Sequence, residues 1–374
     1  MIVIGIDPHK GSHTAVAVAA ATGQMIASKT VKARDQGHDE LVVWARSLGE
    51  NRTFAIEDCR HVSGGLERFL LGRGEQVVRV APKLMAGSRE VARDRGKSDD
   101  IDALSVARAA VREGIETLPC ARLDPESLEI KLLLDHREDL IAERTRDQNR
   151  LRWHLHDLDP DLQIPAGALD RLCWLEKVAK RLARLEQTAR VRISRTLVRR
   201  LRGLIRECNR LETEIATLIR DHAPELLHVH GCGALTAAKL IAETAGADRF
   251  RNEASFARHA GVAPVPVSSG SRQRHRLDRG GNRQLNCALH RIAVVQARTA
   301  GHAGAEYLAA RQASGKSRQD ALRGLKRQLA RTVWKLLIAT EPSHPTRPKS
   351  VLATPTPHPA TTAVSAPSMM PCLT

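Results

Sequence analysis

Aromatic residues and paired cysteines are scarce in this chain of 374 residues. Only 2% of the residues are aromatic, namely four Trp, four Phe and one Tyr. Nucleic-acid-binding proteins that stack bases need exposed aromatic side chains in series, so any such contact here should rest on Arg, Lys and backbone amides. The seven cysteines are scattered without a CxxC pair. This pattern argues against a disulfide framework or a zinc ribbon and predicts a reducing cytoplasm.

Long apolar runs are also missing. No stretch approaches eighteen uninterrupted apolar residues, which predicts that the chain has no transmembrane helix. The N-terminus, MIVIGIDPHKG, has no basic region ahead of its apolar run, so we do not interpret it as a secretory signal. We therefore expect a cytoplasmic protein with no membrane partner.

Positive charge, in contrast, is abundant. The chain has 59 Lys and Arg against 42 Asp and Glu, a formal net charge of +17. This excess indicates a polyanionic partner, with nucleic acid as the first candidate and an anionic membrane surface as the second. With 42% hydrophobic residues the chain can build real cores. Its length predicts two to three domains, at roughly 100–200 residues each.

The pattern along the chain divides it into four parts. Residues 1–122 alternate short β-branched runs with helical patterns and predict a mixed α/β sheet covered by helices. Residues 123–225 are highly charged, with leucines at helical spacing, and predict a helical hairpin or coiled-coil arm. Residues 226–340 predict a small, mainly α-helical domain with an irregular segment at Gly261–Gly281. Residues 341–374, rich in Pro, Thr, Ser and Ala, predict a disordered tail. The arm is either a spacer or dimerisation element or one that grips nucleic acid, and these roles are compatible.

Four carboxylates in the first part form a pattern. Asp7 ends the first apolar strand, Glu57 ends the strand TFAIE, and Asp99 and Asp102 lie three residues apart at a predicted helix start. Strand-end acids on neighbouring strands can converge with one helix face at an edge of a sheet. Such a cluster repels itself unless divalent cations lie within it. Two Mg²⁺ ions bound there would clamp the attacking and leaving oxygens of a phosphodiester, as in RNase H-like nucleases.

A basic segment with two serines is the second pattern. Ser268-Ser269-Gly270 follows two prolines, and arginines surround it. A serine hydroxyl needs a base or a metal before it attacks phosphate, and neighbouring cations can bind that phosphate. From the residues alone, the segment is either a Ser-Gly turn in a DNA-binding loop or the site of a nucleophile. The candidate nucleic-acid-binding residues are Arg272, Arg274, Arg276, Arg279 and Arg283.

These motifs resemble a known family. The run GIDPHK, the acid Glu57 and the run KSDDIDA (Lys97 to Ala103) are similar to the D-E-D-x-x-D pattern of DEDD transposases of the IS110 insertion-sequence family. The C-terminal part resembles that family's transposase domain. It has, in the same order, GxG-x-x-TA, a Phe-containing helix, GxAP, SG and RGGNRxL. The resemblance covers roughly residues 1–338.

The resemblance implies a fold and an activity. It implies an RNase H/RuvC-like domain, a coiled-coil arm and a small helical domain. It also implies a bacterial protein that is associated with the nucleoid when it is bound to DNA. It implies strand cleavage and exchange on double-stranded donor and target DNA, guided by a structured bridge RNA, in a homo-oligomer (dimer or tetramer). The family's acids map to Asp7, Glu57, Asp99 and Asp102, as catalytic ligands of Mg²⁺. The family's nucleophilic serine maps to Ser269, which would form a covalent serine–DNA intermediate; Ser268 is the alternative.

Two other functions stay open at this point. One is a Mg²⁺-dependent, RuvC-like nuclease that resolves DNA junctions with water, and the other is a non-enzymatic nucleic-acid scaffold. Gly315-Lys316-Ser317 matches the end of a P-loop, but the earlier glycine that the motif requires is missing. We interpret His9 and His13 as loop residues that face solvent or phosphate.

Overall fold

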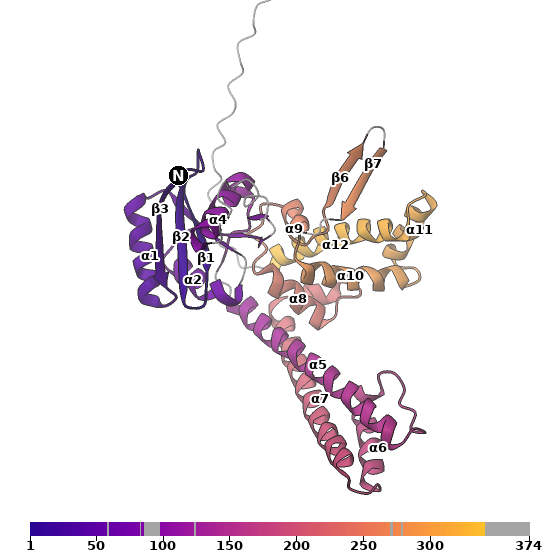
Figure 1. Ribbon diagram of the computed structural model, residues 1–374. Helices are drawn as coiled ribbons and strands as arrows, with labels where there is room; N and C mark the ends of the chain where they lie inside the picture. Colours follow the sequence, from indigo (N-terminus) through magenta and orange to yellow (C-terminus); the bar gives the residue numbers. More distant parts are fainter. Residues whose placement is uncertain are drawn as a thin grey trace, which may run out of the picture. The chain divides into compact units, whose positions relative to one another are not determined.

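The computed structural model describes residues 1–340 except 58–59, 83, 86–97, 123–124, 270–271 and 278–279. For residues 60–61, 268–269, 272–275 and 277 it describes the backbone only. A sheet domain, a helical arm and a C-terminal domain follow one another along the chain (Figure 1). The predicted tail lies outside the described residues. No helix in the described part has the length and apolar content that a membrane crossing requires.

The N-terminal domain is built on a five-stranded mixed sheet in the order β3-β2-β1-β4-β5. Its strands are β1 (Ile2–Pro8), β2 (Ser12–Ala19), β3 (Met25–Lys32), β4 (Arg52–Glu57) and β5 (Val77–Val80). The pairs β1–β2 and β2–β3 are antiparallel, whereas β1–β4 and β4–β5 are parallel. This sheet confirms the predicted mixed α/β domain.

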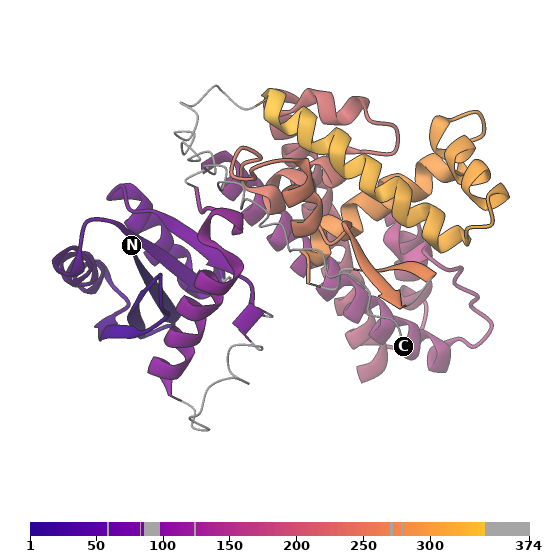
Figure 2. The same cartoon turned by 90° about the horizontal axis from the view of Figure 1, so that it is seen from above.

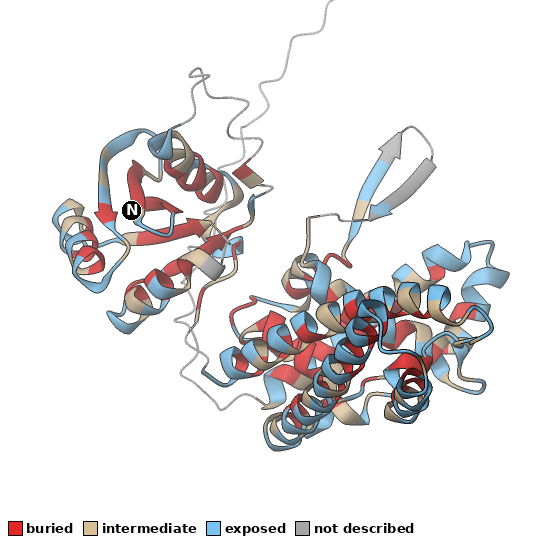
Figure 3. Cartoon of the chain, turned by 60° about the horizontal axis from the view of Figure 1, so that its bottom comes forward, coloured by how far each residue is buried: buried red, intermediate tan, exposed pale blue. Residues whose placement is uncertain are grey.

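Helices cover both faces of this sheet. They are α1 (Asp35–Leu48), α2 (Arg60–Gly72) and α4 (Asp99–Glu113). Successive side chains of β1 point to opposite faces of the sheet, as in any β-strand. Ile4 and Ile6 pack with α1 and α2, whereas Val3 packs with α4. Figure 3 shows in red that buried residues lie along the strands and helices of this domain.

Gly5 lies on the face of β1 that α4 covers. A Cβ atom at this position would come within 2.2 Å of the carbonyl oxygen of Ala103 and 2.4 Å of the backbone nitrogen of Ala107. Only glycine lets a strand and a helix backbone approach this closely. Gly5 therefore sets how near the N-terminal turn of α4 comes to the end of β1.

The second region consists of two long antiparallel helices and one short one. They are α5 (Pro125–Leu158), α6 (Leu172–Ala183) and α7 (Ala189–His222). Leu151, Leu155, Leu201 and Ile205 form part of the core between them. The predicted helical hairpin is present, and its assignment as a coiled coil stays a prediction.

The C-terminal domain is mainly helical, with one two-stranded hairpin (Figure 1). Its elements are η3 (Pro224–His228), α8 (Ala234–Thr244), α9 (Glu253–His259), β6 (Pro264–Ser269), β7 (Arg272–Leu277), α10 (Arg283–Arg298), α11 (Ala303–Ala313) and α12 (Arg318–Thr340). Ile130 of α5 and Ile215 of α7 belong to its hydrophobic core. One core therefore joins residues on both sides of the predicted boundary at 225/226.

Our prediction of an irregular segment at Gly261–Gly281 is wrong, because most of this segment forms the antiparallel β6–β7 hairpin. Pro264 and Pro266 suggested a loop. Each strand of a two-stranded hairpin has one free edge, and alternating prolines can direct their missing N–H groups to that edge. Val265 and Val267, which alternate with the prolines, are the strand signal that we did not weigh.

Candidate metal centre and serine hairpin

The predicted acids of β1 and β4 end neighbouring parallel strands. Ile6 of β1 pairs with Ile56 of β4, so the next residue of each strand, Asp7 and Glu57, lies beside the other. Ala55, two residues before Glu57, packs with α4, and Gly5, two residues before Asp7, faces the same helix. The strand period of two therefore places both acids on the face that α4 covers.

The first turn of α4 supplies the other two acids. Ser98 is the N-cap, as the sequence predicted, and its Oγ accepts a hydrogen bond from the backbone N–H of Ile101 at 3.3 Å. This cap fixes where the helix begins and so places Asp99 and Asp102 in its first turn. The contact at Gly5 brings that turn to the end of β1. Both acids lie close enough to Asp7 to raise its pKa.

Asp7 is the buried member of the group, with 6% of its surface exposed. Burial raises the pKa of this carboxyl group; His9 lowers it, and the charges of Asp102 and Asp99 raise it further. Its Oδ2 is buried and has no well-directed hydrogen bond. A buried carboxylate oxygen among other acids is unfavourable unless a cation lies beside it.

His9 completes the group, and the sequence interpretation missed it. Its Nε2 lies 3.1 Å from Oδ2 of Asp7 and 3.4 Å from Oδ1 of Asp99. One donor atom from each of these three residues lies within 4.8 Å of the others. We had interpreted His9 as facing solvent or phosphate. The available signal was its position two residues after the strand acid, in the short turn that leads back into β2.

The donor set fits a divalent cation. Carboxylate oxygens suit Mg²⁺ and Mn²⁺, and an added imidazole shifts the preference towards transition metals. Asp7, His9 and Asp99 form the tight group, and Glu57 and Asp102 lie at the same sheet edge without belonging to it. The structure therefore supports a divalent metal at this edge.

His13, our other loop histidine, is a core residue of β2, and that interpretation was wrong. It is 2% exposed, and its ring stacks on His38 of α1 with 5.3 Å between the ring centroids. The pKa of His13 is lowered to about 4, chiefly by burial and to a smaller extent by the neighbouring His38 and His9. His13 therefore belongs to the hydrophobic interior rather than to the metal site.

The predicted nucleophile lies at the end of a strand. Ser268 and Ser269 are the last two residues of β6, and Ser269 pairs with Arg272 at the closed end of the hairpin. The side chains of Ser269, Arg272 and Arg274 lie outside the described part of the structure, as does the whole of Arg279. No contact described for the chain joins this hairpin to the carboxylates of the sheet domain.

The RGGNR motif builds the base of the hairpin. A Cβ atom on Gly281 would come within 2.1 Å of the backbone nitrogen of Gly261, so the chain crosses itself here. Asn282 caps α10: its Oδ1 accepts hydrogen bonds from the N–H groups of Gln284 (2.8 Å) and Leu285 (3.1 Å). Arg276 and Arg283 are both exposed. The motif therefore has a structural role beside any contact with DNA.

Comparison with known proteins places these features in a family. Residues 4–160 match a DEDD domain model of the IS110 group, described as a transposase. Residues 223–309 match the model of the transposase IS116/IS110/IS902 family. A protein of insertion element IS116 from Streptomyces clavuligerus is 28% identical over 90% of this chain and 94% of its own. A protein of insertion element IS110 from Streptomyces coelicolor is 30% identical over 64% of this chain and 70% of its own.

Solved structures of Thermus thermophilus RuvC are also similar. The structure with a Holliday junction substrate is 18% identical, with a TM-score of 0.24 over 30% of this chain and 96% of RuvC. A second RuvC structure is 19% identical, with a TM-score of 0.26 over 32% and 100%. The two family models and the relatives agree along the chain. This protein therefore belongs to the IS116/IS110/IS902 family of transposases, enzymes that transfer phosphoryl groups on DNA.

Proposed function

We propose that this transposase exchanges DNA strands through a serine–DNA intermediate, with Asp7, Glu57, Asp99 and Asp102 holding two Mg²⁺ ions. The observation that carries the proposal is the convergence of acids from β1, β4 and α4 at one edge of the sheet, with Asp7 buried among them. Bound metal would supply stabilisation of the charge that develops on the phosphate oxygens. His9, which contacts two of the acids, is a further candidate ligand.

In this proposal Ser269 takes part in two balanced steps. Its Oγ attacks a DNA phosphorus, one P–O bond of the strand breaks, and the proton of the serine passes to the leaving oxygen, which becomes a free hydroxyl. A hydroxyl freed in this way on the partner strand then attacks the phosphoserine; the Oγ–P bond breaks, the proton of that hydroxyl returns to Oγ, and a phosphodiester is restored. The arginines Arg272, Arg274, Arg276, Arg279 and Arg283 would hold the DNA phosphates.

Donor and target duplexes, a structured bridge RNA and a homo-oligomer (dimer or tetramer) belong to the same proposal. A composite site between two copies of the chain, as the family resemblance implies, would bring the nucleophile to the metal. The excess of Arg and Lys over aromatic residues favours a protein that holds nucleic-acid backbones and leaves sequence reading to base pairing.

Covalent adducts test the nucleophile. Labelled DNA is incubated with the protein and Mg²⁺ and run on a denaturing gel. We expect Ser269→Ala to abolish the protein–DNA adduct, and the matched control Ser268→Ala to retain it. Adducts in Ser269→Ala would overturn the assignment.

A second candidate is a metal-dependent nuclease that uses water and leaves the serine with a structural role. The acids that meet at the sheet edge favour it, because a metal held there could activate water without the serine. It predicts that Ser269→Ala cleaves DNA at the normal rate and that the unaltered protein forms no adduct on the same gel.

A further inference from the structure

A groove in the C-terminal domain is lined by positive charge. It has a volume of about 1060 Å³ and lies between the base of the β6–β7 hairpin, α11 and α12. Figure 2 shows α12 running along this domain beside α11 and the hairpin. Its cationic lining residues are Arg276, Arg311, Lys316, Arg323, Lys326 and Arg327. Asp320 is the single carboxylate among the described residues of the lining.

Lys326 is the buried cation of this groove. It is 7% exposed, and its Nζ donates a hydrogen bond to Oδ1 of Asn286 at 2.9 Å. The amide of Asn286 is held in place because its Nδ2 donates to the carbonyls of Ala260 (3.2 Å) and Gly261 (2.9 Å). Burial lowers the pKa of Lys326, and the nearby Arg323 lowers it further. A neutral amide offsets little of the cost of a buried ammonium group, so an anion in the groove would stabilise this residue.

The acids near the groove already have partners. Ser317 lies just before the first residue of α12. Its Oγ donates a hydrogen bond to Oδ2 of Asp320 at 2.7 Å and accepts one from the backbone N–H of Asp320. Arg323 donates to the other carboxylate oxygen of Asp320 at 2.8 Å. Glu253, outside the lining, pairs with Arg327 (3.7 Å) and Arg331 (2.8 Å). The segment that matched a P-loop ending therefore caps α12, and the charge of the groove stays strongly positive.

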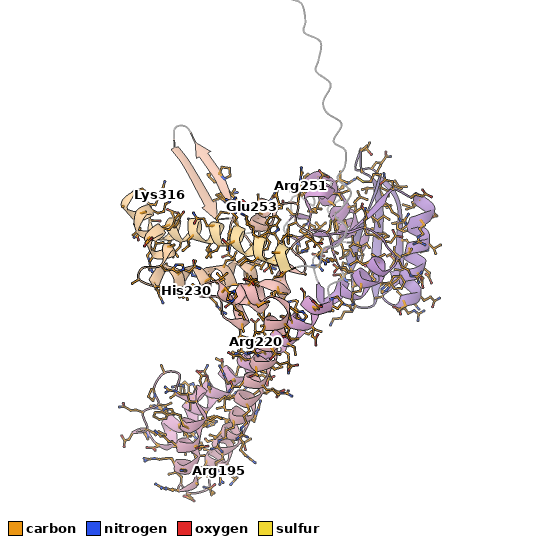
Figure 4. The ribbon with its side chains drawn as sticks, turned by 180° about the vertical axis from the view of Figure 1, so that it is seen from behind. Arg195, Arg220, His230, Arg251, Glu253 and Lys316 are labelled. Carbon is orange, nitrogen blue, oxygen red and sulfur yellow. The ribbon has the colours of Figure 1, made fainter. Side chains whose placement is uncertain are left out.

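Four of the six cations lie on α12 or just before it, spread along the helix rather than meeting at one point. Arg323 and Arg327 are one helical turn apart, a rise of about 6 Å, and Lys316 lies just before the first turn. Figure 4 labels Lys316 at this end of the domain and Glu253 of α9, which pairs with Arg327 and Arg331 farther along α12. A row of cations suits a chain of phosphates better than a single small anion.

The chain's one tyrosine forms part of the same groove. A Cβ atom on Gly324 would come within 2.4 Å of the Tyr307 hydroxyl, so Gly324 lets this ring lie against α12. The guanidinium carbon of Arg311 lies 6.0 Å from the ring centroid. A half-buried aromatic ring beside a cation can contact the sugar or base of a bound strand.

We propose that this groove binds the phosphodiester backbone of a nucleic-acid strand, at a site separate from the carboxylates of the sheet domain. Five of its six cations lie beyond residue 309, where the match to the family model ends. Arg276 and Pro264 join the groove to the base of the hairpin that ends at Ser269. The strand would therefore pass beside the serine hairpin. The inference rests on the proposed function only in taking nucleic acid as the ligand.

The test measures binding in the full-length chain carrying Asp7→Asn, so that a failure of the proposed chemistry does not affect the result. Arg323→Gln with Arg327→Gln removes two ion-paired arginines of the groove. The matched control is Arg46→Gln with Arg73→Gln, which removes two ion-paired arginines of α1 and the residue after α2. The probes are a single-stranded DNA, its duplex and an RNA of equal length.

We expect the groove variant to bind at least one probe ~10-fold more weakly, and the control to change by less than about twofold. The slope of log affinity against log salt should fall by about 1.4 for a single strand or about 1.8 for a duplex, the loss expected for two phosphate contacts. The probe that loses affinity identifies DNA or RNA as the ligand. Equal weakening by both variants, or an unchanged salt slope for every probe, overturns the proposal.

Lys326→Met is a second, independent test. It removes the buried charge and keeps an unbranched apolar side chain. We expect affinity to fall several-fold while the melting temperature of the free protein stays the same or rises. If Lys326 served only the fold, its replacement would lower the melting temperature. An unchanged affinity would overturn the role of Lys326.

Discussion

The sheet edge and the C-terminal groove both concentrate charge of one sign, but they differ in sign and in architecture. At the sheet edge, Asp7 is buried beside acids from two other elements, and they meet at one point. In the groove, Lys326 is buried beside a row of cations along α12. The point cluster suits a small divalent cation and the row suits an extended polyanion. In both regions the fold holds an unfavourable charge that the ligand would stabilise.

Asp7→Asn should have the largest effect, because it removes the buried member of the point cluster. We expect DNA cleavage to fall by on the order of 10³-fold, as for the loss of other preorganised electrostatic groups. Since burial raises the pKa of Asp7 above its usual value, the ionised carboxylate destabilises the fold at neutral pH. The metal-free variant should therefore melt at a higher temperature.

Added metal should affect the stability of the natural chain and of Asp7→Asn differently. Mg²⁺ at roughly 100 times its Kd should stabilise the natural chain by about 2.7 kcal/mol and leave Asp7→Asn unaffected. Asp100→Asn, an exposed neighbour in the same turn of α4, is the matched control and should keep both cleavage and metal stabilisation. Thermal melts with and without MgCl₂ measure the effect. Equal stabilisation of Asp7→Asn and the natural chain would contradict a metal centre at Asp7.

Gly5→Ala should break the point cluster without changing any charge. The new methyl group would collide with the backbone of α4, which cannot rotate away. We expect a loss of about 3 kcal/mol in the free energy of unfolding, measured by urea denaturation, and a lower affinity for Mn²⁺. Gly65→Ala in α2, where nothing lies within 4 Å, should instead gain roughly 0.5–1 kcal/mol. Equal effects of the two substitutions would disprove the close approach.

His13 is a contrasting case, because it is a buried titratable group that is neutral in the fold and needs no ligand. Its pKa of about 4 in the fold lies below the unfolded value of 6.5. Its contribution to stability is therefore complete above pH 6.5 and is lost as the pH falls towards 4, by about 3 kcal/mol at most. His13→Phe keeps a ring against His38 and should flatten the dependence of the melting temperature on pH in this window. An unchanged dependence would show that His13 does not titrate with unfolding.

His9→Ala should have the smallest effect and refine the identity of the metal. Because imidazole favours transition metals over Mg²⁺, we expect Mn²⁺ affinity to fall about 10-fold and Mg²⁺ affinity to change little. Calorimetric titration of both metals measures this. His156→Ala, on the exposed side of the arm, is the control. If both affinities fall equally, His9 positions the acids rather than binding the metal.

The sequence predicted much of the point cluster and little of the groove. Asp7 and Glu57 end recognisable strands, and Ser98 precedes a recognisable helix, so short-range patterns indicated that the acids would meet. His9 was missed because its proximity to Asp99 depends on α4, which begins some ninety residues later. The groove was missed because Arg276 belongs to a hairpin whose prolines suggested a loop, and because the other cations lie on α11, on α12 and in the turn between them.

The sequence by itself determined the family, the mixed sheet, the long helices and the acids that end β1 and β4. Each of these depends on residues close together in the chain, where period and capping act directly. Only the tertiary structure decided that Gly5 brings α4 onto β1, that His9 joins two acids, and that Lys326 is buried in a cationic groove. The physical reason is that electrostatic effects depend on distance and burial, and for residues on separate elements packing alone fixes both.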